Sequence, residues 1–216
     1  MEETKKKGLN TSSNSYTIIY SVVIVVIVAF LLAFVSSTLK PQQDENVALD
    51  KKKQILAALN IRDIDGAEAT EQYNKVVTAD KIIDRNGEEV EAGKQGGTEA
   101  GFLCNSASTK EGKLALYVCN VDGETKYVIP VYGMGLWGGI SGYIALNADK
   151  QTVYGAYFNH EGETAGLGAE IKDSRAWQDQ FKGKHIFAAG KEGVALSVVK
   201  KNEVSDPTTQ CDAVTG

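Results

Sequence analysis

A long run of uncharged residues near the N-terminus constrains this chain more than any other feature of its sequence. From Tyr16 to Val35 the chain reads YTIIYSVVIVVIVAFLLAFV. At about 1.5 Å per residue, a helix over this run spans roughly 30 Å, the thickness of a bilayer's hydrocarbon core. Valine and isoleucine disfavour helices in water, but a backbone in lipid must satisfy its own hydrogen bonds. The run therefore predicts a transmembrane helix, which we assign to residues 16–37.

The charges on the two sides of this run predict its orientation. Three consecutive lysines, Lys5–Lys7, precede it, whereas a lone Lys40 and then acidic residues follow. The positive-inside rule makes residues 1–15 a cytoplasmic tail and residues 38–216 an extracytoplasmic domain. A cleaved signal peptide is the alternative, because the basic start suits it equally. The length of the apolar run and the lack of a good Ala-x-Ala site favour a retained anchor.

Charge and cysteine content exclude several classes of protein. The formal net charge of −5 is modest and argues against non-specific nucleic-acid binding. Three cysteines without a CxxC pair give no support to a disulfide scaffold or a zinc site. Cys104 and Cys119 could form a disulfide on neighbouring strands in an oxidising compartment. The alternative, which the composition favours, is that the cysteines are small buried hydrophobic residues.

Periodicity and turn signals downstream predict an α+β domain with a mostly antiparallel sheet and flanking helices. A polar exit at 41–43 precedes a helix over 46–59, residues 91–112 form a long loop, and a short helix covers 174–181. Strands are expected at 82–83 and 90 around Asn86-Gly87, at 114–118 paired with 127–132, at 140–146, at 152–158, and in a hairpin of 186–188 with 194–199. Pro130 should make its strand an edge or give it a bulge. Hairpins dominate and no βαβ series occurs, so the sheet is antiparallel.

The usual catalytic motifs are missing from this sequence. It contains no Walker A loop, no GxSxG, no HExxH and no two-cysteine metal pattern. Its two histidines, His160 and His185, offer little material for a triad or a metal site. We therefore assign no catalytic residue and no metal ligand.

Two glycine-rich stretches, 133–142 and 160–171, are the remaining candidates for a site. Glycine permits positive φ and allows the backbone to approach a planar ligand closely. The Thr164 hydroxyl and nearby backbone N–H groups could bond a ring edge, while Leu167 and Trp137 offer apolar faces. Composition alone slightly favours the plainer interpretation, a pair of tight connections between sheet and helix.

The same stretches carry a family resemblance. The run GMGLWGGISGYIAL, followed by FNHEGETAGLGAEI, closely resembles the NqrC subunits of the sodium-translocating NADH:quinone oxidoreductases and, more loosely, the RnfG subunits of the Rnf electron-transport complexes. Both belong to the FMN-binding domain family, whose second motif commonly reads GETPGLG. Ala165 replaces that proline here, which should alter loop stiffness more than chemistry. Further matches are LDKKKQIL at 49–56, WQDQFKGK at 177–184, VVK at 198–200 and DAVTG at 212–216, so the resemblance spans nearly the whole chain.

The end of the chain resembles the family's flavin attachment motif. In that family FMN is joined through its phosphate to a threonine hydroxyl in a motif like D-x-x-[S/T]-G-A-T. The first five positions are matched by Asp212, Ala213, Val214, Thr215 and Gly216. The acceptor threonine is expected two residues past Gly216, so Thr215 is not the attachment point. The resemblance implies FMN that is covalent in the full-length protein and absent or non-covalent in the chain as given.

The resemblance also implies roles for individual residues. Residues of the second motif, Glu163, Thr164, Gly166, Leu167 and Gly168, are expected to bind the ring. Trp137 should flank it, and Lys200 lies where a positive charge could favour the reduced anion. Asp212, Val214, Thr215 and Gly216 complete the predicted cofactor-binding set.

The function implied is that of an electron-relay subunit of a membrane NADH:quinone reductase that pumps Na⁺. Such a translocase subunit need not bind NADH or ubiquinone itself. Its expected partners are other integral-membrane subunits, membrane lipid and a flavin transferase, in a bacterial inner membrane with the main domain periplasmic. The alternatives are an electron-transport subunit of the RnfG type and a membrane-anchored binding or assembly module without a cofactor.

Overall fold

A computed structural model describes residues 11–200 and 202–214 of the chain. The structure divides into two units, residues 1–48 and residues 49–216. Helix α1, Asn14–Ala58, begins in the first unit and ends in the second. Within the described residues, α1 is the one helix long and apolar enough to cross a membrane. Its apolar side chains between Ile18 and Val35 are exposed, as a lipid-facing helix requires.

The predicted helices over 16–37 and 46–59 are parts of this single helix, which continues through the polar residues 41–43. Pro41 lies inside the helix, where it removes one backbone hydrogen bond. One side-chain hydrogen bond with i,i+4 spacing spans the proline, from Lys40 to Asp44 at 3.0 Å, and a second follows it, from Gln42 to Asn46 at 3.4 Å. Such pairs support a helix where its backbone ladder is interrupted.

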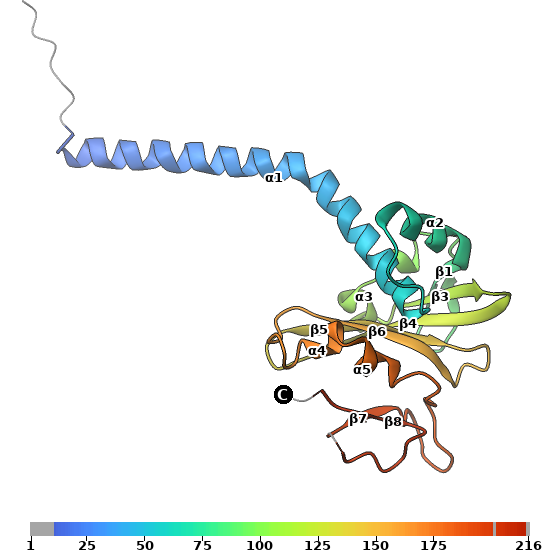
Figure 1. Cartoon of the computed structure of the whole chain (residues 1–216). Helices are drawn as coiled ribbons and strands as arrows, with labels where there is room; N and C mark the ends of the chain where they lie inside the picture. The colour runs from blue at the N-terminus through green and yellow to red at the C-terminus, as the bar shows by residue number, and fades with distance from the viewer. Residues whose placement is uncertain (1–10, 201, 215–216) are drawn as a thin grey trace, which may run out of the picture. The chain divides into compact units, whose positions relative to one another are not determined.

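A six-stranded antiparallel sheet forms the centre of the second unit (Figure 1). Its strand order is β2-β1-β3-β4-β5-β6. The strands are β1 Val77–Ile83, β2 Glu89–Glu91, β3 Leu114–Val121, β4 Glu124–Met134, β5 Gly139–Leu146 and β6 Val153–His160. The predicted α+β class, the strand pair around Asn86-Gly87 and the pairing of 114–118 with 127–132 are confirmed. Asp122 and Gly123 have φ values of 52° and 85°, as a tight two-residue hairpin turn requires.

Pro130 occupies a position that is locally an edge, as predicted. Strand β4 pairs with β3 only as far as Val128, opposite Tyr117. Beyond that point β4 pairs with β5 alone, with Pro130 opposite Tyr143. The side of β4 that lacks a partner can therefore accommodate a residue without an N–H.

Helices cover both faces of the sheet (Figure 1). One face carries α2 (Gly66–Val76), the short helices η1 (Gly101–Leu103) and α3 (Ser106–Lys110), and the end of α1. Here Tyr73 and Tyr117 are fully buried, and the domain's three cysteines are buried with free thiols. The predicted long loop at 91–112 thus contains two short helices.

The opposite face carries α4 (Glu170–Asp173) and α5 (Arg175–Asp179). Its core is a cluster of apolar side chains: Leu146, Val153, Ala156, Ile171, Trp177, Phe181 and Cys211, with Ile140, Phe158 and Val214 packed against it. The predicted helix at 174–181 is confirmed with a shorter span. Ser174 caps it, because the Ser174 hydroxyl accepts the Trp177 N–H at 3.2 Å. In this core, Phe158 near the end of β6 and residues Cys211 and Val214 belong to one packed cluster.

The predicted hairpin of 186–188 with 194–199 is wrong. Strand β7 (Ser197–Val199) pairs instead in parallel with β8 (Gln210–Asp212). The backbone N–H groups of His185 and Ile186 already donate to Thr208 O at 2.8 Å and Gln151 O at 2.9 Å, so they are not free to build a ladder. The parallel pair places β7 beside the final residues of the chain.

Candidate functional site

The structure brings the two glycine-rich stretches side by side. The first forms the turn between β4 and β5, which a hydrogen bond from Gly135 N to Gly138 O closes at 2.8 Å. The second follows β6 directly. Because Ile140 of β5 lies opposite His160 of β6, both loops leave the sheet at the same end. We call residues 135–139 and 161–168 the loop pair.

The second loop folds into a tight turn that leads into α4. The N–H groups of Leu167 and Ala169 both donate to the Thr164 carbonyl at 3.1 Å. Gly166 has a φ of 73°, and a side chain at this position would meet nothing within 4 Å. Thr164 and Gly166 are both exposed. The turn therefore has open backbone and an exposed hydroxyl that a ligand could reach.

Exposed apolar side chains gather on the loop pair. The indole of Trp137 is 68 % exposed and Leu167 is 47 % exposed, and Leu136 and Met134 are each 82 % exposed. Large apolar groups left in solvent on adjoining loops are typical of a binding site. An indole and an isobutyl group are the apolar surfaces that a flat aromatic ring would cover.

Several other glycines of the loop pair allow the two loops to pack closely, which agrees with the plainer interpretation of two tight connections. A Cβ on Gly168 would lie 2.6 Å from Glu163 Oε2, and one on Gly162 would lie 2.9 Å from the Trp137 carbonyl. Glu163 itself is half-buried, and its Oε1 accepts the Trp137 backbone N–H at 3.0 Å. The structure therefore joins the predicted residues Trp137, Glu163 and Gly168 through direct contacts.

The last described residues lie against α4 and α5. The indole N–H of Trp177 donates to the Asp212 carbonyl at 2.7 Å, and the Asp212 N–H donates to Gln180 Oε1 at 3.0 Å. A cavity of about 290 Å³ is lined here by Glu170, Ser174, Ala176, Trp177, Gln180, Asp212, Ala213 and Val214. Glu170 is two residues past the turn at 163–168. The cavity is therefore lined both by the segment that follows this turn and by residues 212–214. Thr215 and Gly216 lie outside the described residues.

Lys200 belongs to the chain-end part of the candidate site. It directly follows β7, is exposed, and sits beside the hydrogen bond of 2.7 Å from Ala213 N to Val199 O. The Asp212 carboxylate accepts the Asn202 N–H at 2.9 Å on the same side. The structure thus groups Lys200 with Asp212, whereas Trp137 and Leu167 belong to the loop pair.

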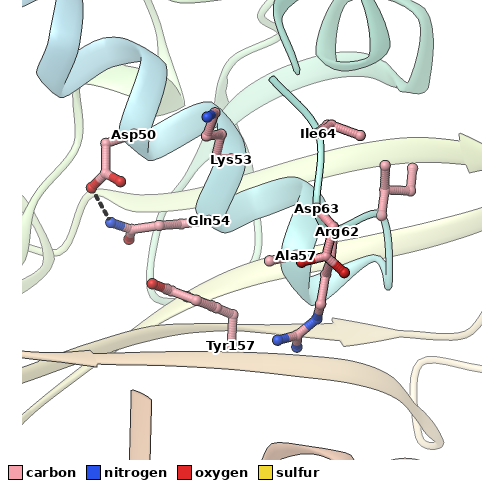
Figure 2. A pocket seen from close by; sticks show the side chains of 9 residues that line it. Asp50, Lys53, Gln54, Ala57, Arg62, Asp63, Ile64 and Tyr157 are labelled. Carbon is pink, nitrogen blue, oxygen red and sulfur yellow. Dashed lines mark hydrogen bonds between the residues drawn. The ribbon is translucent and has the colours of Figure 1, made fainter. Parts of the chain in front are cut away.

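Among the further cavities of the described residues, two adjoin the end of α1 and the loop pair, respectively. Figure 2 shows one of about 270 Å³, lined by Asp50, Lys53, Gln54, Ala57, Ile61, Arg62, Asp63, Ile64 and Tyr157. Its Arg62 guanidinium donates to Gln178 Oε1 and to the Ala156 carbonyl, both at 2.8 Å, and burial lowers its pKa. The charges lining this cavity balance, and the arginine is held by the fold.

The larger cavity, of about 570 Å³, lies beside α3. It is lined by Asn105, Ser106, Lys110, Tyr132, Gly133, Met134, Gly139, Ile140, Ser141 and Glu161. Burial raises the pKa of the Tyr132 hydroxyl, which therefore stays protonated at neutral pH. Glu161, which sequence reasoning missed, connects this cavity to the loop pair. Within residues 11–200 and 202–214, no group of three or more acidic, histidine or cysteine side chains could hold a metal ion.

Comparison with known proteins gives consistent relatives. Residues 135–216 match the FMN-binding domain family. The chain is 34 % identical over 179 residues to the NqrC subunit of the Na(+)-translocating NADH-quinone reductase of Haemophilus ducreyi, covering 75 % of this chain and 68 % of the relative. It is 28 % identical over 229 residues to the corresponding NqrC subunit of Pseudomonas aeruginosa, covering 96 % and 87 %.

Solved structures agree with these relatives. The fold is similar to the crystal structure of the NqrC subunit of the same reductase from Parabacteroides distasonis, with a TM-score of 0.73 and 36 % identity, covering 82 % of this chain and 84 % of that one. A more distant likeness, at 23 % identity and a TM-score of 0.61, to the NqrC structure from Shewanella oneidensis supports the fold.

Proposed function

Because this chain belongs to the NqrC family of Na(+)-translocating NADH-quinone reductase subunits, we propose that it carries FMN and relays electrons within such a membrane reductase. It does so as one subunit, handing electrons to and from neighbouring integral-membrane subunits. The chain itself needs no NADH or quinone site for this role. Sodium transport is the work of the assembled complex.

The observation that carries this proposal is the approach of the chain end to the turn at 163–168. Glu170, just past that turn, lines one cavity with Asp212 and Val214. The family's attachment motif begins at Asp212, so a tether starting there is short. We infer that a flavin held by such a tether reaches the loop pair.

The residues present fit an isoalloxazine ring. FMN, when bound, supplies one- and two-electron redox chemistry that no side chain of this protein offers. Trp137 and Leu167 provide exposed apolar faces, and the open backbone at Gly166 permits close approach. The Thr164 hydroxyl can hydrogen-bond a polar ring edge. Lys200 brings a positive charge to the chain-end side of the site.

We propose further that the attachment is covalent, through a phosphoester to a threonine two residues past Gly216. A covalent tether fixes the local concentration of the flavin and removes the need for a phosphate-binding loop. The lack of a Walker-type motif in the sequence supports this arrangement. A dedicated flavin transferase would form the ester.

We also propose that the chain is a single-pass membrane protein. Residues 1–15 form a cytoplasmic tail, residues 16–37 cross a bacterial inner membrane, and residues 38–216 form a periplasmic FMN-binding domain. Helix α1 and the lysines before the apolar run support this topology. Residues after Pro41 should be cleaved by external protease in spheroplasts, and their protection would contradict the orientation.

The proposed function is tested by a denaturing gel. Full-length protein produced together with its flavin transferase should run as a band with flavin fluorescence. A dark band, from protein shown by mass spectrometry to be intact, would contradict covalent attachment. Lack of FMN in the protein purified without denaturation would contradict the cofactor itself.

A further inference from the structure

Two glutamates connect the two loops of the loop pair, because their carboxylates accept hydrogen bonds from backbone N–H groups. Glu163 Oε1 accepts the N–H of Trp137 at 3.0 Å, and Glu161 Oε2 accepts the N–H of Gly139 at 3.3 Å. The backbone adds a bond from Glu161 N to Gly139 O at 3.0 Å. Two N–H groups of the first loop, from residues two positions apart, thus donate to carboxylates of the second loop.

These hydrogen bonds extend the β5–β6 ladder beyond the ends of the two strands, with side-chain carboxylates as the acceptors. Ile140 lies opposite His160 in the β5–β6 ladder. Continued in the same register, Gly139 would lie opposite Glu161 and Trp137 opposite Glu163, and these are the residues that the carboxylates join. Where the strands end and the loops diverge, side-chain oxygens take over from backbone carbonyls. A charged acceptor makes such a hydrogen bond stronger than a neutral one would.

The glycines around the two carboxylates explain why they fit. A Cβ on Gly135 would collide with Glu163 Oε1, and a Cβ on Gly139 would lie 3.0 Å from the Glu161 carboxylate. With Gly168 at 2.6 Å from Glu163 Oε2, glycines of both motifs surround the Glu163 carboxylate. The space that the two carboxylates occupy therefore requires glycine at positions 135, 139 and 168.

The second glutamate is itself held in place. The backbone N–H of Glu163 donates to His160 Nδ1 at 3.2 Å, which fixes the start of the turn that leads to Thr164. The Trp137 backbone is therefore linked through Glu163 to the turn that bears Leu167. Because the Trp137 and Leu167 side chains are largely exposed, packing contributes little to their placement. The carboxylate contacts must supply that order.

We propose that Glu161 and Glu163 are positioning residues of the flavin site, which lock the 135–139 loop to the 163–168 turn so that Trp137 and Leu167 face one ring. This assigns to Glu163 a role in loop order in place of the ring contact that the resemblance implies, and adds Glu161 to the site. The inference rests on the proposed function for the identity of the ring. The lock itself exists without it.

Amide hydrogen exchange on full-length protein tests the lock directly. Glu163→Ala should speed exchange of the Trp137 amide by roughly tenfold or more, because it loses a charged acceptor, while Gly139 stays protected. Glu161→Ala should show the reverse pattern. Glu163→Gln keeps an acceptor oxygen and should retain most of the protection. Glu192→Ala, an exposed glutamate on another loop, is the control, and the Ile144 amide within β5 reports whether each variant is folded.

Flavin spectroscopy on the same flavin-loaded variants tests the positioning role. Glu163→Ala should change the visible circular dichroism of the bound flavin, and Glu163→Gln should restore it. Unchanged exchange at Trp137 in a folded Glu163→Ala protein would overturn the lock. Altered exchange with an unaltered flavin spectrum would overturn the positioning role. If the wild-type protein binds no flavin but its Trp137 amide is still protected from exchange through Glu163, the proposed function fails while the contact between the loops stands.

Discussion

The indole N–H of Trp177 donates a hydrogen bond of 2.7 Å to the backbone carbonyl of Asp212. This contact fixes the chain's final strand against α5. The ring of Trp177 also packs edge-on against Phe158 and Phe181, at centroid distances of 5.5 and 5.3 Å. One side chain therefore connects β6, α5 and the start of the proposed attachment motif.

Replacing Trp177 by Phe should keep most of the packing and lose the hydrogen bond. The Asp212 carbonyl would then lack a partner in a partly buried place, which costs about 1–3 kcal/mol of unfolding free energy. Urea unfolding followed by circular dichroism measures this loss. The matched control is Trp137→Phe, whose exposed ring should change stability by no more than about 0.5 kcal/mol. Equal midpoints for the two variants would contradict the role given to Trp177.

Trp137 should matter for the flavin and not for the fold. Trp137→Ala in flavin-loaded protein removes an aromatic contact of about 0.5–1.5 kcal/mol, so the docked population of the ring should fall by up to roughly tenfold. The flavin should become more fluorescent and more accessible to a soluble quencher. Trp137→Phe, which keeps an aromatic face, should resemble the wild type. Identical quenching in all three proteins would place the ring elsewhere.

Lys200 should raise the reduction potential of the flavin. Its positive charge stabilises the negative charge that reduction adds, by at most on the order of 1 kcal/mol for an exposed lysine. Lys200→Ala should therefore lower the midpoint potential in a spectroelectrochemical titration, and less so at high salt. Lys191→Ala, another exposed lysine, is the control. An unchanged or higher potential in Lys200→Ala would remove this residue from the site.

Lys51 provides a test of the fold through pH. Its ammonium donates to the Phe102 carbonyl and, at 3.0 Å, to the Cys104 carbonyl, and burial lowers its pKa to about 8. Between about pH 8 and the ordinary lysine value near 10.5, the unfolded state binds more protons, so this residue makes stability rise with pH. The penalty for burying its charge is fully present below pH 8.

The check is a comparison with Lys51→Met across that pH range. The unfolding free energy of wild type should rise relative to that of the variant as pH increases from 8 to 10.5. Taking the difference removes the opposite contribution of the buried tyrosines and cysteines, whose pKa values burial raises. Direct titration of Lys51 by NMR near its ordinary pKa would contradict the burial argument.

Local signals in the sequence predicted the sheet well. Asn86-Gly87 and Asp122-Gly123 mark turns whose geometry only a few residues adopt, and alternating apolar residues predicted the strands beside them. The parallel pair of β7 and β8 could not be predicted in this way. Each of these strands is three residues long, and their pairing joins segments far apart in sequence without a turn signal between them.

The candidate site could be predicted only in part for a similar reason. The glycine-rich motifs and the family resemblance directed attention to Trp137 and Leu167, and the structure shows that both are exposed. The part played by Glu161 and Glu163 depends on the register of β5 against β6, which the sequence alone does not define. Around Pro41, α1 is likewise supported by side-chain bonds, one spanning the proline and one following it, that the helix signals alone did not predict.

The central claim is that a flavin ring lies between Trp137 and the 163–168 turn. Nuclear Overhauser contacts between flavin ring protons and selectively labelled side chains of flavin-loaded, full-length protein measure this directly. We predict contacts to the Leu167 methyl groups and to the Trp137 indole. Contacts to Tyr157, in the cavity beside the end of α1, without any to Leu167 or Trp137 would contradict the account.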